Sequence, residues 1–256
     1  MAELEIHQFP CLDDNYGVLI RDSESGLVAS IDAPSADAVR GALKEKGWTL
    51  THILTTHHHW DHTDGNLPLK EETGCTIVGP RAEADKVPGI DEQVGEGDTF
   101  TFGGFEVKVF DTPGHTAGHI TYWMPQASVA FVGDVLFAMG CGRVIEGSME
   151  QMWNSVEKVA KLPPETMLYC GHEYTIANAK FALTVEPGNT TLQARAKQAE
   201  ELRAAGKPTL PTKLADELAT NPFIRADSAE IRQVIGMGSA SNGAVFAEVR
   251  ERKNRG

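Results

Sequence analysis

Short runs of apolar and β-branched residues dominate the first two-thirds of the chain. Several of these runs are bounded by Gly, Pro or Asp, as the ends of strands commonly are. Their length and spacing predict many short strands rather than a helical bundle. The runs are LEIHQF, YGVLIRD, LVASIDA, THILTT, CTIVG, TFTFGGFEVKVFDT, HITYWM, SVAFVGD and MLYCGH.

Two stretches between these runs have helical spacing instead. One follows Ser35, a candidate N-cap, and ends at Gly47. The other follows Ser148, which has Gln151 three residues further on, and stops before Pro163. This Ser/Gln spacing is the capping-box pattern of a helix start. Many strands with a few helices between them predict an α/β fold in which two sheets are covered by outer helices.

The pattern changes after about residue 172. Runs rich in Ala, Gln, Glu and Arg replace the β-branched runs and predict an all-helical tail. No Gly/Ser-rich or Pro-rich linker precedes the tail, so we expect its roughly 80 residues to pack on the sandwich. The predicted division is therefore a first domain of residues 1–174 and a C-terminal helical domain of residues 175–256.

Composition narrows the classes of partner and the cellular location. The 256 residues carry a formal net charge of −13, which disfavours binding to nucleic acid or to an anionic membrane surface. No basic and apolar leader opens the chain, and no apolar run approaches the roughly 20 residues that span a bilayer. The four cysteines are widely spaced, without a CxxC pair, which indicates reduced thiols. We expect a cytoplasmic monomer.

The segment TTHHHWDH, residues 55–62, is the strongest chemical signal in the chain. It follows the predicted strand THILTT, and in an extended chain His57 and His59 point to one side while His58 points to the other. A helical turn beyond Trp60 would bring Asp61 and His62 to a second position nearby. Imidazole and carboxylate together suit zinc, iron or manganese rather than calcium.

Three further polar residues stand at or just after predicted strand ends. His115 follows a Pro-Gly turn, Asp134 ends the run SVAFVGD, and His172 ends MLYCGH. Ligand residues often collect at such strand ends, so we predict a two-metal site. His57, His59 and His115 are assigned to one ion, Asp61, His62 and His172 to the other, and Asp134 to both as a bridge. Of the remaining histidines, His7, His52 and His58 are expected to bind no metal, whereas His119 could hydrogen-bond a ligand.

The order THHHWDH, TPGHTAGH, GD and GHEY resembles the metallo-β-lactamase superfamily. The resemblance implies a four-layer αββα sandwich with a two-metal site along one edge. Members cleave lactams, lactones, thioesters and phosphodiesters, and some are redox enzymes. Two divalent ions activate a hydroxide, and the chain has neither a GxSxG elbow nor a cysteine acyl site, so hydrolysis is expected. Asp61 and Asp134 would serve this catalysis as metal ligands.

Motifs outside the metal ligands narrow the resemblance. LDDNYGVLI, GCGRVIEG, HEYT, EPGN, NPFIR and RERK resemble the hydroxyacylglutathione hydrolase (glyoxalase II) family along essentially the whole chain. This implies hydrolysis of S-(2-hydroxyacyl)glutathione, such as S-D-lactoylglutathione, in the second step of methylglyoxal detoxification. The chain has Ile145 where members often have an aromatic residue. The resemblance assigns glutathione binding to Arg143, Tyr174, Arg250 and Lys253.

The charge of the C-terminus agrees with that assignment. The last seven residues, RERKNRG, hold four basic residues and one acidic residue, although the chain as a whole is acidic. Glutathione carries two carboxylates, which a local cationic pocket would bind. The alternative is that these cations interact only with the dipole at the end of a helix.

Two other functions compete with thioester hydrolysis. A persulfide dioxygenase resembles the chain in the HHHxDH segment, but it uses a single iron and lacks the helical tail with NPF. A non-catalytic protein with a structural metal is the second alternative. Structural zinc sites are usually closed cages of four ligands, so seven candidate ligands argue against it.

Overall fold

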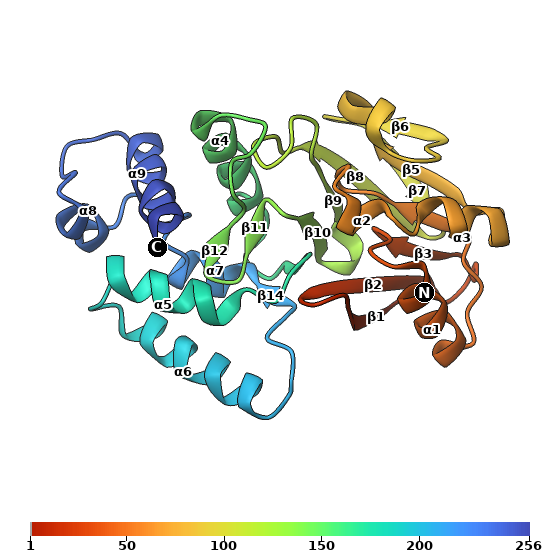
Figure 1. Ribbon diagram of the computed structural model, residues 1–256, viewed down its shortest axis with the longest axis horizontal. Coiled ribbons are helices and arrows are strands. Elements are labelled where there is room, and N and C mark those ends of the chain that lie inside the picture. The colour runs from red at the N-terminus through yellow and green to blue at the C-terminus, as the bar shows by residue number, and fades with distance from the viewer. Residues whose placement is uncertain (1) are drawn as a thin grey trace. The chain divides into compact units, whose positions relative to one another are not determined.

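The computed structural model describes residues 2–256, and their contacts divide the chain into two compact units (Figure 1). The first unit comprises the residues up to Asp111 together with Thr116–Gly133, and the second comprises Thr112–His115 and Asp134–Gly256. The predicted domain boundary after Tyr174 falls within the second unit and stays a prediction. Among the described helices, none is long and apolar enough to cross a membrane.

A six-stranded mixed sheet forms one layer of the first unit. Its strands follow chain order across the sheet, antiparallel from β1 to β3 and parallel from β3 to β6. Five of these six strands, β1 to β5, lie in runs that were predicted as strands, but β6 was not predicted, because two of its three residues are exposed and polar. The strands are β1 (Leu4–Cys11), β2 (Asn15–Asp22), β3 (Val28–Ile31), β4 (His52–Leu54), β5 (Thr76–Pro80) and β6 (Glu92–Val94).

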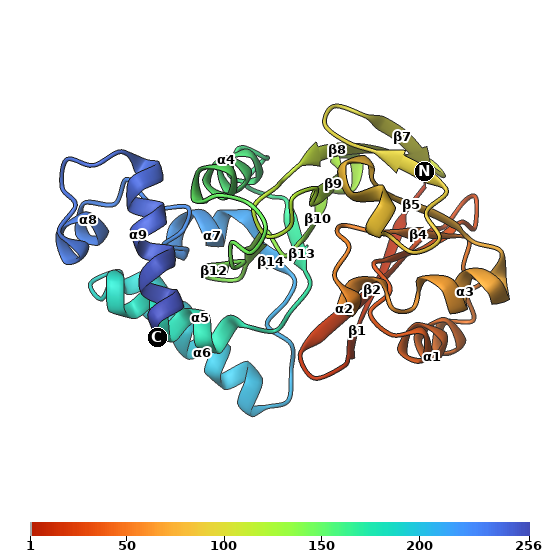
Figure 2. The same ribbon diagram turned by 45° about the horizontal axis from the view of Figure 1, so that its top comes forward.

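Helices α1 (Ala36–Lys46) and α3 (Asn66–Thr73) pack on one face of this sheet (Figure 2). As predicted, α1 begins after Ser35, whose hydroxyl accepts from the Ala38 amide at 3.4 Å, and it ends at Gly47 in the left-handed conformation. Their apolar side chains share one buried core with the sheet. This core includes Val39, Leu43, Leu69, Leu19, Ile53 and Ile77.

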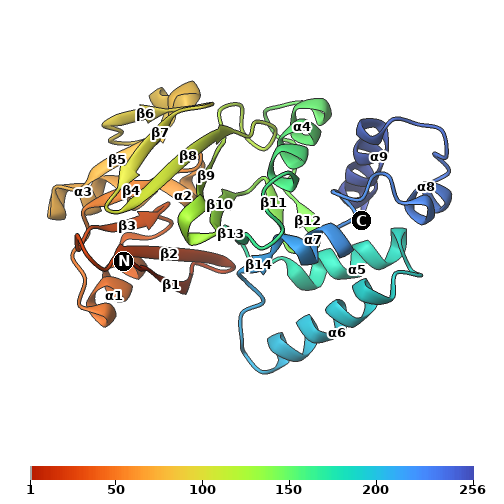
Figure 3. The same cartoon turned by 180° about the vertical axis from the view of Figure 1, so that it is seen from behind.

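A second layer of antiparallel strands packs on the opposite face of the sheet (Figure 3). The fully buried Tyr122 spans the two layers, because its hydroxyl donates to the Thr55 carbonyl at 2.8 Å. Two short 3₁₀ segments, η1 (Arg81–Lys86) and η2 (Pro125–Ala127), connect strands in this unit. The strands of the second layer are β7 (Thr99–Phe102), β8 (Phe105–Asp111), β9 (Ile120–Met124) and β10 (Val129–Gly133).

The second unit is mostly helical. Its helix α4 (Met149–Ala160) begins with the predicted capping box, in which Ser148 and Gln151 bond each other's backbone amides. Two strand pairs, β11 (Leu136–Phe137) with β12 (Gly140–Cys141) and β13 (Met167–Cys170) with β14 (Thr212–Lys213), complete it. The tail helices are α5 (Thr175–Val185), α6 (Thr190–Ala204), α7 (Leu214–Thr220), α8 (Ala229–Ile235) and α9 (Asn242–Arg255).

The tail departs from the all-helical prediction at one place. Pro208 and Pro211 exclude a helix between α6 and α7, and the extended Thr212 and Lys213 pair with β13 as β14. Elsewhere the tail is helical, and α5 packs on α6 through small buried residues, which allow the two backbones to approach closely. These residues are Ala179, Ala182, Ala196 and Ala199.

Candidate active site

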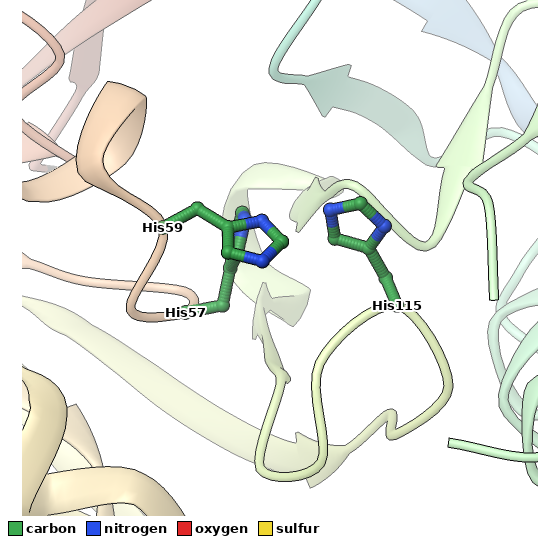
Figure 4. Close-up of side chains that lie close together, drawn as sticks. All are labelled: His57, His59 and His115. Atoms are coloured by element: carbon green, nitrogen blue, oxygen red, sulfur yellow. The ribbon is translucent and has the colours of Figure 1, made fainter. Parts of the chain in front are cut away.

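The histidine run lies in the loop between β4 and α2 (Trp60–Thr63). The imidazoles of His57 and His59 lie together, with their ring centroids 4.9 Å apart (Figure 4). His58 instead places Nδ1 3.1 Å from a carboxylate oxygen of the buried Glu83. The His58 ring centroid also lies 5.1 Å from that of His59, so the assignment of His57 and His59, but not His58, to a metal stays a prediction.

The one-turn helix α2 brings Asp61 and His62 to the same cluster. The His62 ring centroid lies 4.1 Å from that of His57, and His62 Nε2 lies 3.7 Å from Asp61 Oδ2. Asn15, at the start of β2, donates to the Asp61 carbonyl at 3.1 Å and to Asp61 Oδ2 at 3.3 Å. The structure thus brings together the four candidate ligands of the first unit and orients one of them through Asn15.

Asp32 orients two of these imidazoles from a neighbouring strand end. Its Oδ2 accepts from His62 Nδ1 at 2.8 Å and from the Thr56 hydroxyl at 2.9 Å. The Thr56 hydroxyl has only one proton, so at 3.0 Å from His57 Nδ1 it acts as the acceptor. Both imidazoles then carry the proton on Nδ1, which leaves Nε2 as the nitrogen with a lone pair for a metal.

Glu83, in η1, anchors the same loop from another side. Its carboxylate accepts from the His58 amide at 2.8 Å and from the Gly118 amide at 2.8 Å. The Thr116 hydroxyl also lies 3.2 Å from this carboxylate. One buried acid therefore ties the histidine loop to the loop before β9.

A glycine is required beside this cluster at position 133. Its φ is +47°, and a Cβ there would lie 2.6 Å from both His119 Nε2 and the Thr56 hydroxyl. His119 stacks on His57, with the ring centroids 4.9 Å apart. The Gly of the GD motif thus leaves room for the side chains that surround His57.

The second unit contains the other three candidate ligands. Asp134 Oδ2 lies 3.4 Å from His115 Nε2 and 3.3 Å from His172 Nε2. His115 projects from the loop after β8 (Figure 4). Its Nδ1 lies 2.9 Å from the Arg143 carbonyl and donates to it. This bond again leaves Nε2 as the lone-pair nitrogen, on the side of the carboxylate.

The residues assigned to glutathione also lie in the second unit. Tyr174 stacks on His172, with centroids 4.8 Å apart and planes 2° apart, and its ring meets the edge of Phe137. Arg143 is exposed just beyond β12. At position 145, where the resembling family often has an aromatic residue, this chain has an exposed isoleucine, Ile145.

Two cations of the RERK segment extend from α9 toward the same region. Arg250 is buried and donates to the Cys141 carbonyl at 2.8 Å. Lys253 donates to Asn178 Oδ1 and lies over the Phe181 ring, 5.7 Å from its centroid. Burial, reinforced by the neighbouring Arg250 charge, lowers the pKa of Lys253 to about 8.

A pocket of about 740 Å³ opens beside this segment. Its cationic lining contrasts with the acidic chain as a whole, and the apolar lining comes mainly from Phe181 and Ala177. An anionic ligand with an apolar stem fits such a lining. The four cationic residues are Lys180, Arg252, Lys253 and Arg255.

Sequence reasoning missed three residues that orient the candidate ligands. Asp32 lies in the run LVASIDA directly after β3, at a strand end as Asp134 does, so the same criterion could have found it. Asn15 lies in the quoted motif LDDNYGVLI. Nothing in the sequence pointed to Glu83, because its segment RAEADK has the polar composition of a solvent-exposed surface. The Glu83 side chain is nevertheless buried.

Comparison with known proteins extends these observations. The model "Metallo-beta-lactamase superfamily" matches residues 29–172, and the model "Hydroxyacylglutathione hydrolase C-terminus" matches residues 173–256. Curated hydroxyacylglutathione hydrolases of Brucella ovis and Brucella canis are each 57% identical over 251 residues. The alignments cover 98% of this chain and 98% and 96% of those proteins, respectively.

Solved structures confirm the predicted fold class. ETHE1 from Myxococcus xanthus matches with a TM-score of 0.67 and 27% identity, over 98% of this chain and 99% of that one. The BLEG-1 B3 metallo-beta-lactamase matches with a TM-score of 0.67 and 20% identity, over 86% of this chain and 99% of that one. The αββα sandwich with a C-terminal helical domain is therefore confirmed, and the histidine and acidic clusters support binding of divalent metal.

Proposed function

Because the chain belongs to the hydroxyacylglutathione hydrolase family of the metallo-beta-lactamase superfamily, we propose that it hydrolyses S-(2-hydroxyacyl)glutathione thioesters. The representative substrate is S-D-lactoylglutathione, and the products are glutathione and a 2-hydroxy acid. This reaction is the second step of methylglyoxal detoxification. The observation that carries the proposal is the 57% identity to hydroxyacylglutathione hydrolases over 98% of both chains.

We further propose that two divalent ions bind the seven candidate ligands, with zinc expected and iron or manganese as alternatives. The Nδ1 hydrogen bonds of His57, His62 and His115 support this, because each leaves Nε2 for coordination. Such ions supply polarisation of the thioester carbonyl and a water of lowered pKa. The proposed sets are His57, His59 and His115 for one ion, Asp61, His62 and His172 for the other, and Asp134 for both.

The two acidic ligands have distinct roles in this proposal. Asp134 Oδ2 lies within 3.4 Å of two imidazoles of its unit, which supports the proposal that its carboxylate is shared by both ions. Asp61 is proposed as a ligand rather than a proton donor, and Asn15 holds its carboxylate in one orientation. A leaving thiol of pKa about 8.5 departs without a strong general acid, so the chain needs no further acid for this step.

The helical tail, residues 175–256, is proposed to bind the glutathione moiety together with Arg143 and Tyr174. Lys253 and Arg250 offer cations for the carboxylates of glutathione, and the pocket beside α9 adds further positive charge. The ring of Tyr174 stacks on that of His172. The Tyr174 hydroxyl is therefore a hydrogen-bond donor attached to a ring beside this proposed ligand. This arrangement supports recognition of the peptide part separately from the acyl group.

We propose that the protein acts as a monomer in the cytoplasm. The four cysteines are buried and reduced, which suits a reducing compartment. Light scattering after gel filtration would test the oligomeric state, because a dimer has twice the mass of the 27.7 kDa chain.

The experiment that tests the function is turnover of S-D-lactoylglutathione with detection of the released thiol. Elemental analysis of protein purified without added metal gives the metal content in parallel. We expect thiol release that chelation abolishes and metal restores. The lactoyl thioester of a small thiol, which lacks the peptide, should react with a higher KM. Oxygen consumption with a single iron and no thiol release would contradict the proposal.

A further inference from the structure

We infer that the helical tail also positions the metal ligands of its unit, by holding the turn between β11 and β12. Glu217 and Asn221 are the positioning residues, and Asp134 and Arg143 are the residues that they position on either side of the turn. The inference rests on the proposed function. It specifies what the motif NPFIR, which contains Asn221, contributes to the site.

The turn has a backbone that must be held by its surroundings. Met139 has a φ of +54°, a backbone conformation that residues other than glycine rarely adopt. At the next position, a Cβ on Gly140 would clash with the side-chain amide of Asn178. Conformations of this kind persist where neighbouring groups over-determine them.

Side chains of the tail hydrogen-bond the backbone of every residue from 137 to 140. Asn221 contributes two of these bonds, and Glu217 and Asn178 contribute one each. In sequence order, Asn221 Nδ2 donates to the Phe137 carbonyl at 3.1 Å, Asn178 Nδ2 donates to the Ala138 carbonyl at 2.9 Å, Glu217 Oε2 accepts from the Met139 amide at 2.8 Å, and Asn221 Nδ2 donates to the Gly140 carbonyl at 2.9 Å.

Glu217 is itself held rigidly. Its side chain is 0% exposed and forms an ion pair with Arg195. The Thr212 hydroxyl donates to its Oε1 at 2.6 Å, and Asn221 Nδ2 lies 2.9 Å from its Oε2, so the two amide protons of Asn221 are shared among this oxygen and the two turn carbonyls. A buried carboxylate with this many partners keeps one geometry, and losing a partner is costly because the charge stays buried.

Short connections transmit the position of the turn to the site. Asp134 lies two residues before β11, and Arg143 lies two residues after β12. The Arg143 carbonyl is the group that accepts from His115 Nδ1 at 2.9 Å. A displaced turn would therefore shift both the Asp134 carboxylate and the acceptor that orients the His115 ring.

The turn is also linked to the cation proposed for glutathione. Asn178 donates to the Ala138 carbonyl, while its Oδ1 accepts from Lys253. Arg250 donates to the Cys141 carbonyl at 2.8 Å, one residue beyond the turn. The same stretch of backbone thus supports the ligands of the metal site and the contacts of α9.

Two variants and a matched control test the inference. Asn221→Asp replaces the donating amide by oxygens that face the Phe137 and Gly140 carbonyls, and Glu217→Gln removes the buried charge while keeping an acceptor. Glu186→Gln is the control, because Glu186 is 1% exposed and pairs with Arg225 at 2.7 Å without touching the turn. Hydrogen exchange of residues 134–143, followed by mass spectrometry, and elemental analysis provide readouts independent of activity.

Faster exchange of residues 134–143 is expected in Asn221→Asp and Glu217→Gln, but not in Glu186→Gln. Metal affinity and kcat/KM should fall about 10- to 100-fold in the first two variants, which is typical of lost outer hydrogen bonds at metal ligands. The loss should affect lactoylglutathione and the lactoyl thioester of a small thiol alike. The milder Glu217→Gln retains a folded protein for comparison if Asn221→Asp does not fold.

Three results would overturn the inference. The first is unchanged exchange and metal affinity in both variants. The second is the same change in Glu186→Gln, which would show general loss of stability. The third is a loss confined to the glutathione thioester with normal metal affinity, which would restrict the tail to substrate binding. If the wild-type protein released no thiol, the proposed function would fail, while exchange and metal affinity would still decide the inference.

Discussion

The carboxylate of Asp32 lies 2.8 Å from Nδ1 of His62, and the same oxygen accepts from the Thr56 hydroxyl at 2.9 Å. Through Thr56 it also orients His57. One carboxylate outside the histidine run therefore determines which nitrogen two of its imidazoles present to a metal.

Asp32→Asn should weaken metal binding by roughly 10- to 100-fold, because the amide no longer offers two carboxylate acceptors. Asn tolerates the φ of +55° found at this position, so backbone strain is not added. Competition with a coloured chelator measures the affinity. Asp37→Asn, which changes an exposed carboxylate on α1, is the control. Equal affinity for Asp32→Asn and wild type would contradict the role assigned to Asp32.

Replacing adjacent histidines should have opposite effects on metal content. His59→Gln is expected to lose metal and at least about tenfold in kcat/KM, because His59 lies beside His57 as a proposed ligand. His58→Gln should keep its full metal complement, because the His58 ring faces Glu83. Elemental analysis of both variants distinguishes them. Loss of metal in His58→Gln alone would reverse the assignment.

Lys253 should make substrate binding sensitive to alkaline pH. Burial and the Arg250 charge lower the pKa of Lys253 to about 8, so the ammonium is lost above that pH. The KM for lactoylglutathione should then rise above pH 8 toward the value of Lys253→Met. Lys253→Arg should show a flatter profile, because a guanidinium stays charged. Spontaneous thioester hydrolysis is subtracted at each pH, and identical profiles for wild type and Lys253→Arg would exclude this role.

The same pKa has an effect on stability. The folded-state pKa lies below the unfolded value of about 10.5, so between pH 8 and 10.5 the unfolded chain binds more protons. The unfavourable contribution of Lys253 to folding is therefore relieved as pH rises through this window. Lys253→Met should lose that pH dependence, which urea unfolding at pH 7.5 and pH 10 would measure. If the free energy of unfolding of Lys253→Met depended on pH as that of the wild type does, this contribution of Lys253 to stability would be contradicted.

Glu83→Ala should lower the free energy of unfolding by roughly 1–3 kcal/mol, because buried donors of His58 and Gly118 lose their acceptor. Glu72→Ala removes an exposed partner of Arg40 and should lower the free energy of unfolding less than Glu83→Ala does, because water screens an exposed ion pair. Urea denaturation of the metal-free proteins measures both. Similar costs for the two substitutions would show that Glu83 does not anchor the histidine loop.

Local features of the structure were predictable from the residues themselves. The helices α1 and α4 begin at Ser35 and Ser148 as expected, because a cap is a contact between near neighbours in the chain. The pairing of β14 with β13 was not predicted, because its partner strand lies more than 40 residues away and its two residues have no periodicity.

The candidate ligands were recognisable because metal chemistry restricts them to a few residue types, clustered at strand ends. The residues that orient them were not, since Asp32, Glu83 and Asn221 have ordinary side chains that acquire a role only from distant partners. Asp32 met the strand-end criterion, but nothing in the sequence paired it with His62, 30 residues further on.

The sequence by itself determined the fold class, the family and the set of residues that offer ligands, because these depend on short-range periodicity and on the chemistry of individual side chains. Only the tertiary structure decided which imidazole nitrogen faces a carboxylate, why His58 turns to Glu83, and how Asn221 holds the turn beside Asp134. The physical reason is that hydrogen bonds between residues far apart in the chain require a folded backbone to bring donor and acceptor within about 3 Å.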